Sequence, residues 1–95
     1  MKRAYETIFI VDAEIGEDAI QATIEKFKAL IEKAGEIESL EEWGNRKLAY
    51  EIKDRKSGYY VFVTHQCAPD FPVELERNFK ITESILKYLV IRKES

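Results

Sequence analysis

The sequence has little of the chemistry on which most active sites depend, beginning with a single cysteine, Cys67, in 95 residues. A lone cysteine forms no intramolecular disulfide, and a cysteine-based metal site would lack its other sulfur ligands. There is also no glycine-rich phosphate loop, no HExxH pair and no clustered set of metal ligands. These absences exclude a disulfide scaffold, predict no metal or cofactor, and are typical of a protein in a reducing compartment.

Long apolar runs are missing as well. The N-terminal segment MKRAYETIFIVDAE has two cations and an apolar run of four residues before Asp12, too short for a secretory signal. No segment approaches the roughly 20 apolar residues of a membrane span, so we expect a cytoplasmic protein. The apolar fraction of 45% suffices for one core, which predicts a single domain over residues 1–95.

The charges are unevenly divided along the chain. The net charge is −3, but residues 1–42 carry five Lys/Arg and eleven Asp/Glu, whereas residues 43–95 carry ten and seven. Because salt screens charges beyond about 8 to 10 Å at physiological ionic strength, distant acids do not prevent a cationic patch from contacting phosphate. The acidic total leaves nucleic-acid binding open, beside the simpler interpretation of a solvated surface.

Two features of the sequence bear on catalysis. His65 and Cys67 are two residues apart, and a histidine beside a cysteine can activate a thiolate, but no third group is indicated to orient them. The second feature is the loop after the first expected strand. Acylphosphatases, whose ferredoxin-like fold has the same order of strands and helices, hold a phosphoryl group in this loop. Here that loop, DAEIGE at residues 12–17, is acidic and would repel such a substrate. We therefore expect no enzyme activity.

Hydrophobic periodicity predicts strands and helices in alternation. Residues 5–11 are rich in aromatic and β-branched types, which favours a strand. Residues 17–34 have apolar side chains at helical spacing, and Gly35 suits a left-handed C-terminal cap. A long strand over residues 36–52, bent near Gly44, follows the helix, and alternation assigns its side chains Leu48, Tyr50 and Ile52 to packing.

The second half of the chain continues the alternation. A polar turn at 53–58 leads to a third strand at 59–66, and residues 85–91 form the last strand. Between them, Asp70 is a candidate N-cap for a second, shorter helix. The apolar residues expected on the buried side of that helix are Val73, Leu75, Phe79 and Ile81.

The resulting order β-α-β-β-α-β favours an α+β two-layer sandwich with the ferredoxin-like fold. Right-handed crossovers place both helices on one face of a four-stranded antiparallel sheet with strand order 4-1-3-2. The other face of the sheet is left uncovered. What that open face carries decides how the function is interpreted.

Alternation along the first strand separates two sets of side chains. The set assigned to the core is Tyr5, Thr7, Phe9 and Val11. Ile8 and Ile10 then face outward, where a partner surface could cover them. On the third strand both sets are apolar, so one of them lies on the open face. We assign to it Tyr59, Val61 and Val63. A register error by one residue is the alternative.

The segment 56–63 has part of the aromatic pattern with which an RNA-recognition motif stacks bases. Its second stacking position is Val61, and Phe9 is assigned to the core, so base stacking across the sheet is not expected. RNA contacts should come instead from cations at strand ends that reach phosphates. The candidates are Lys2, Arg3, Arg46, Lys47 and Arg92, whereas a soluble turn is the favoured interpretation of Lys53, Arg55 and Lys56.

The segment Trp43-Gly44-Asn45-Arg46-Lys47-Leu48-Ala49-Tyr50 resembles the W-G-x-R-x-L-A-Y signature of the S-six family of bacterial small-subunit ribosomal proteins. Further matches at corresponding spacing are Tyr5-Glu6, Gly58-Tyr59-Tyr60 and Leu89-Val90-Ile91-Arg92. The resemblance covers nearly the whole chain.

The resemblance implies a non-catalytic ribosomal protein that binds the central domain of small-subunit rRNA as a heterodimer with the S-eighteen protein. By position in the family, the resemblance implies that Arg46 and the basic N-terminus at Lys2 and Arg3 contact RNA. Lys47 and Arg92 are further candidates. The implied protein partner agrees with an apolar open face. A regulatory domain of the same fold that binds a small ligand is the alternative.

Overall fold

The computed structural model describes residues 2–93. Its elements are β1 (Arg3–Asp12), the short 3-10 helix η1 (Ala13–Ile15), α1 (Glu17–Ala34), β2 (Gly35–Ile52), β3 (Arg55–Cys67), α2 (Phe71–Ile81) and β4 (Ile85–Arg92). The predicted order of strands and helices is confirmed. The third strand begins earlier than expected, because the turn before it is shorter.

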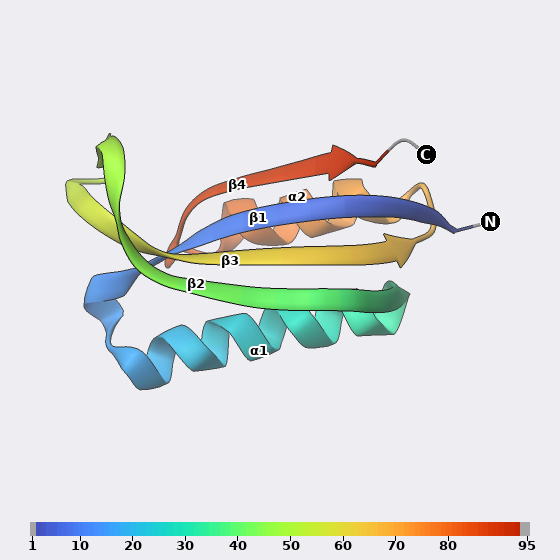
Figure 1. The fold of residues 1–95 in the computed structure, drawn as a ribbon, viewed down its shortest axis with the longest axis horizontal. Helices are drawn as coiled ribbons and strands as arrows, with labels where there is room; N and C mark the ends of the chain where they lie inside the picture. Colours follow the sequence, from blue (N-terminus) through green and yellow to red (C-terminus); the bar gives the residue numbers. More distant parts are fainter. Residues whose placement is uncertain (1, 94–95) are drawn as a thin grey trace.

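The strands form one antiparallel sheet in the order β2-β3-β1-β4. Figure 1 views this sheet from its open face, with α2 behind β1 and β4 and α1 along the β2 side. Both helices therefore pack on the same side. The ferredoxin-like fold and the strand order expected from the sequence are confirmed.

The main core lies between the sheet and the two helices, and aromatic rings form its centre. Phe9 on β1 has its ring centroid 5.5 Å from that of Phe27 on α1 and 5.2 Å from that of Phe79 on α2. Phe27 and Phe79 stack at 4.4 Å. The expected core set of β1 is confirmed, since Tyr5, Thr7, Phe9 and Val11 are all buried.

The two expected helix caps have different outcomes: the left-handed cap at Gly35 is wrong, and the N-cap position of Asp70 is confirmed. Gly35 has an extended backbone, with φ of −176°, and starts β2 instead of forming a left-handed cap. A side chain there would collide with the carbonyl oxygen of Gln66, so glycine permits β2 and β3 to approach closely. Asp70 occupies the N-cap position of α2, but its side chain makes no capping hydrogen bond.

The buried face of α2 is narrower than its sequence suggests. Phe71, Leu75 and Phe79 are buried, whereas Val73 and Ile81 are 72% and 71% exposed. The predicted burial of these last two is wrong. Because α2 lies at the edge of a small sheet, only one narrow stripe of the helix meets the core.

The second half of β2 curls over the open face, and we call residues 46–52 the hairpin arm (Figure 1). The bend predicted near Gly44 is confirmed, because the β2–β3 register shifts there and Gly44 has φ of 85°. Lys53 and Asp54 close the hairpin with φ of 51° and 64°, as a two-residue turn of this hand requires. The arm thus covers one end of the sheet.

Candidate functional site

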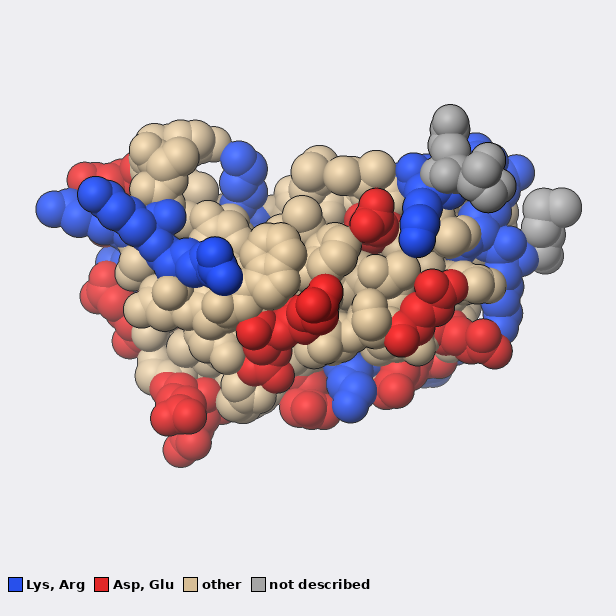
Figure 2. Space-filling model, viewed as in Figure 1, with Lys and Arg blue, Asp and Glu red and all other residues tan. Residues whose placement is uncertain are grey.

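The open face of the sheet carries a continuous apolar surface. Register places Ile8 of β1 opposite both Phe62 of β3 and Leu89 of β4. The large apolar side chains left most exposed on this face are Trp43 at 42%, Leu89 at 51% and Ile91 at 43%. Figure 2 shows this face with mostly uncharged atoms across its middle. Such a surface is typical of a docking site for another molecule.

The assignment of Val61, Val63 and Tyr59 to this face is wrong. Val61 lies opposite Phe9, and Val63 lies opposite Thr7, so both share the core face of β1. Both valines are completely buried against the helices. The face that β3 shows to solvent instead carries Tyr60 and Phe62.

Tyr59 lies on the helix-side face of the sheet, packed against the main core. Its hydroxyl donates to Glu42 Oε1 at 2.8 Å, and that hydrogen bond raises the pKa of Tyr59. Gln21 of α1 donates to the same carboxylate oxygen at 2.9 Å. These contacts join β2, β3 and α1, so Tyr59 has a structural role in this position.

Ile8 and Ile10 do point to the open face, but they differ in accessibility. Ile8 is half-buried. Ile10 is only 6% exposed, because Leu48 of the hairpin arm and Leu86 of β4 pack on it. The expectation that Ile10 stays uncovered is wrong, since the curl of β2 builds a second small core on this side of the sheet.

Trp43 lies on the open face at the bend of β2. Its ring centroid is 5.5 Å from that of Phe62, and the guanidinium carbon of Arg46 lies 5.6 Å above the indole. Arg46 Nε also donates to the backbone carbonyl of Trp43 at 3.4 Å. Trp43 therefore positions the Arg46 guanidinium where the apolar open face meets the hairpin arm.

Sequence reasoning missed four members of the open face: Trp43, Phe62, Leu89 and Ile91. The rule that residues opposite each other on paired strands share a face could have identified them. Once Phe9 is placed in the core, the residue opposite it on β3 is also a core residue, and the neighbours of that residue face outward. The same rule applied to β4 puts Leu89 and Ile91 outside.

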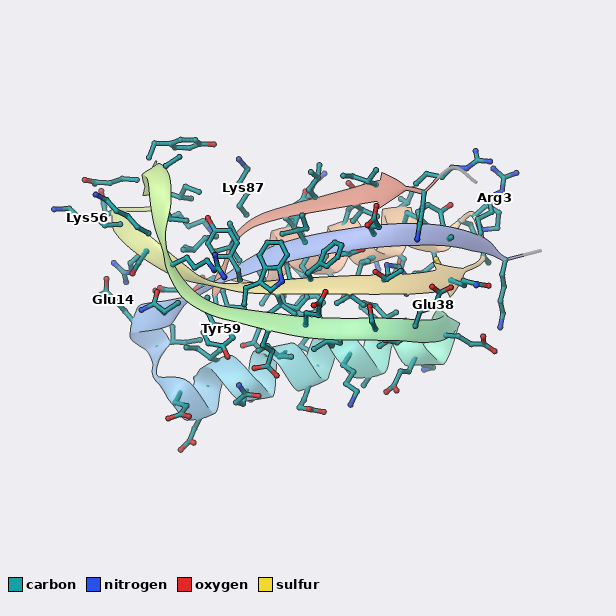
Figure 3. The ribbon with its side chains drawn as sticks, in the orientation of Figure 1. Arg3, Glu14, Glu38, Lys56, Tyr59 and Lys87 are labelled. Carbon is teal, nitrogen blue, oxygen red and sulfur yellow. The ribbon has the colours of Figure 1, made fainter. Side chains whose placement is uncertain are left out.

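The candidate RNA-binding cations fall into two groups at opposite ends of the molecule. Lys2, Arg3 and Arg92 lie where β1 starts and β4 ends, whereas Arg46 and Lys47 lie on the hairpin arm. The ten residues of β1 separate the two ends by roughly 30 Å. Figure 2 shows blue side chains at both ends, and Figure 3 places Arg3 at one end and Lys56 at the other.

These cations differ in how freely they can reach a ligand. Arg46, Lys47 and Arg92 are exposed, and Arg3 is half-buried. Lys2 forms an ion pair with Glu36 at 3.6 Å. An exposed ion pair of this kind contributes little, about 0 to 1 kcal/mol, so a phosphate can displace it.

Two cations of the hairpin turn have structural partners. Arg55 Nε donates to Asp12 at 3.0 Å and lies 3.3 Å from Glu14, and the hydrogen bond with Asp12 raises the pKa of Arg55. Lys53 Nζ donates to the backbone carbonyl of Ile85 at 3.1 Å. Arg55 therefore links the hairpin to the end of β1 and to η1, and Lys53 links it to the start of β4, while Lys56 stays exposed.

His65 and Cys67 are buried on the core face of β3. His65 Nε2 lies 2.7 Å from Thr7 Oγ1, and burial lowers the pKa of His65. Burial also raises the pKa of the Cys67 thiol to about 11, which opposes formation of a nucleophilic thiolate. Neither side chain has access to a substrate.

Within residues 2–93, no group of three or more His, Cys, Asp or Glu side chains is placed to hold a metal ion. In the same part of the chain, neither helix combines the length and the apolar composition needed to cross a membrane. On the open face, a pocket of about 180 Å³ lies between the hairpin arm and the sheet.

Tyr50 of the hairpin arm stands at the mouth of this pocket and is 61% exposed, so its predicted packing in the core is wrong. Lys87 of β4 donates to the Tyr50 hydroxyl at 2.9 Å, and its ammonium lies 5.2 Å above the ring. Lys87 points from the sheet toward the arm in Figure 3. The pair links the arm to β4.

Comparison with known proteins agrees with this architecture. The family model described as Ribosomal protein S6 matches residues 4–92. The small ribosomal subunit protein bS6 of Clostridium novyi (strain NT) is 45% identical over 93 residues, covering 97% of this chain and 98% of the relative. That of Alkaliphilus metalliredigens (strain QYMF) is 47% identical over 88 residues, covering 93% and 94%.

A crystal structure of 30S ribosomal protein S6 from Thermotoga maritima has the same fold, with a TM-score of 0.92 and 32% identity over 98% of this chain and 89% of that chain. These relatives are structural proteins of the small ribosomal subunit and not enzymes, which confirms the expectation of no catalytic activity. With a family model over nearly all its length and relatives above 40% identity, the chain belongs to the ribosomal protein S6 family.

Proposed function

We propose that the chain binds the central domain of small-subunit rRNA together with the S-eighteen protein, and that residues 1–95 act as one domain in this assembly. The observation that carries the proposal is the open face. It combines exposed Trp43, Leu89 and Ile91 with cations at each end. One surface thus suits both a protein and an RNA partner.

Burial of the apolar side chains supplies the free energy for the protein contact. Removing apolar surface from water contributes about 25 cal/mol per Å², and large side chains at the centre of an interface usually contribute most. Trp43 and Leu89 lie over β2 and β4, the two edge strands of the sheet. A partner that covers both must span the whole face.

Cations at the two ends supply the RNA contacts. Arg46 can bind a phosphate in bidentate fashion, because its guanidinium is exposed and is oriented by Trp43. Acidic side chains gather along the edge formed by α1 and β2 in Figure 2. RNA should therefore contact the ends of the sheet and avoid that acidic edge.

A reconstitution experiment tests the proposal. The chain, the S-eighteen protein and a central-domain rRNA fragment are combined, and RNA affinity is measured at two salt concentrations. We expect weak binding by each protein alone and tighter, salt-sensitive binding by the pair. If the pair binds no better than either protein alone, the proposal fails. The alternative of a small-ligand regulatory domain would instead show a rise in melting temperature with a metabolite and no RNA binding.

A further inference from the structure

The pocket beneath the hairpin arm is lined by the sheet on one side and by the arm on the other. Ile8 and Ile10 of the sheet form one side, and Leu48 and Ile52 of the arm form the other. None of these four side chains carries a polar atom. The curl of β2 therefore creates an apolar recess on a face that would otherwise be flat.

The size of the pocket limits what can occupy it. Its volume is about 180 Å³, and a cavity of roughly 150 Å³ lined by aliphatic side chains is enough to bind benzene. One side chain of the size of leucine or phenylalanine fits. A larger cofactor does not.

Lys87 places a positive charge at the mouth. One of its three ammonium protons is donated to Tyr50 at 2.9 Å, and this hydrogen bond raises the pKa of Lys87, which keeps it charged. Among the residues that the structure describes, no carboxylate lies within ion-pair distance of it. The other two protons can therefore bind an anionic group next to the side chain that enters the pocket.

A nucleotide is the competing occupant, because RNA also offers a flat ring beside a negative charge. A base has hydrogen-bonding groups on its edges, and burying them without partners costs about 1 to 3 kcal/mol each. Ile8, Ile10, Leu48 and Ile52 supply no such partner, and the polar side-chain atoms of the lining are limited to the Lys87 ammonium and the hydroxyls of Tyr50, Tyr60 and Tyr88. An apolar amino-acid side chain carries no such penalty, so the lining favours protein over RNA.

We propose that this pocket anchors one apolar side chain of the protein partner, and that Lys87 binds a carboxylate adjacent to that side chain. The inference rests on the proposed function, since it identifies how the S-eighteen protein is held on the open face. Continuity with exposed Leu89, which lies opposite Ile8, makes the pocket part of the same surface.

Calorimetric titration of the S-eighteen protein into four variants tests the inference. Lys87→Glu reverses the charge at the mouth, and Ile8→Phe fills the pocket; each should weaken binding about tenfold. The matched controls are Lys80→Glu and Val73→Phe, both on the exposed side of α2 and away from the open face, and both should bind within about twofold of wild type. Urea unfolding verifies that each variant is folded.

The outcomes separate the inference from the proposed function. If wild type binds the partner and both pocket variants bind it equally well, the inference is wrong and the proposed function stands. If the pocket variants bind the partner normally but the pair loses RNA affinity, a nucleotide occupies the pocket and the inference is again wrong. If wild type does not bind the partner at all, both fail.

Discussion

Leu48 of the hairpin arm packs on Ile10 of β1, and each side chain is only 6% exposed. This contact holds the arm against the open face, forming a second core separate from the one beneath the helices. It also positions Arg46 and Lys47, which precede Leu48 in the same strand. The arm is therefore a rigid platform and not a loose loop.

Leu48→Ala should reduce the free energy of unfolding by about 2 kcal/mol, because it removes buried carbon and leaves a cavity over Ile10. Tyr50→Ala, on the same arm but exposed, should cost less than about 1 kcal/mol. Urea denaturation of both variants provides the comparison. Equal destabilisation by the two changes would mean that burying Leu48 in the second core adds no stability beyond that of an exposed side chain.

Gly58→Ala should be destabilising, by about 1 to 3 kcal/mol, because an added methyl group would collide with the Cγ2 methyl of Ile10. In an Ile10→Ala background the same change should cost much less, since the obstructing group is gone. A double-mutant cycle followed by urea unfolding measures the coupling. Additive effects would show that the collision with Ile10 is not the reason why position 58 requires a glycine.

Stability should fall as the solution is acidified through the range in which histidine titrates. His65 is buried, its Nδ1 makes no hydrogen bond within residues 2–93, and burial lowers its pKa. The unfolded chain takes up a proton below about pH 6.5, while the folded chain does not. The contribution is thus fully present above that pH and is lost as the pH falls toward the lowered pKa.

The His65→Leu variant isolates this effect. Between about pH 7 and pH 5, where most carboxylates remain ionised, its free energy of unfolding should vary less than that of wild type. Denaturant unfolding at several pH values gives both curves. Parallel curves would show that other groups cause the pH dependence.

Arg46→Ala should weaken binding of the protein pair to central-domain rRNA and reduce the salt dependence by about one counterion. The fold should be retained, because Arg46 is exposed and contacts only Trp43 among the interactions described above. Arg77→Ala on α2 is the matched control, an exposed arginine on the helix side. Filter binding at two salt concentrations measures both, and an equal loss in the two variants would contradict a specific role for Arg46.

The sequence was sufficient for the fold because its periodicities were consistent. The helix at 17–34 was predicted to the residue, and alternation placed Phe9 in the core. What alternation could not supply was the choice between the two apolar sets of β3, which depends on pairing across strands. Val61 and Val63 were placed on the wrong face for that reason.

Tertiary curvature explains the remaining differences. Alternation along regular strands predicts an accessible Ile10 and a packed Tyr50. The curl of β2 buries Ile10 under Leu48 and leaves Tyr50 outside with Lys87. Gly44 marked the bend in the sequence, but no local pattern indicated in which direction the strand would turn.

The most direct test of the central claim, that the open face holds the protein partner, compares Leu89→Asp with Val73→Asp. Leu89 lies on the open face and Val73 on α2, and both are large apolar side chains that are at least half exposed, so neither change should unfold the domain. Affinity for the S-eighteen protein is measured by calorimetry. Leu89→Asp should lower this affinity at least about tenfold, whereas Val73→Asp should change it little. Equal affinities, or a loss confined to Val73→Asp, would contradict the central claim.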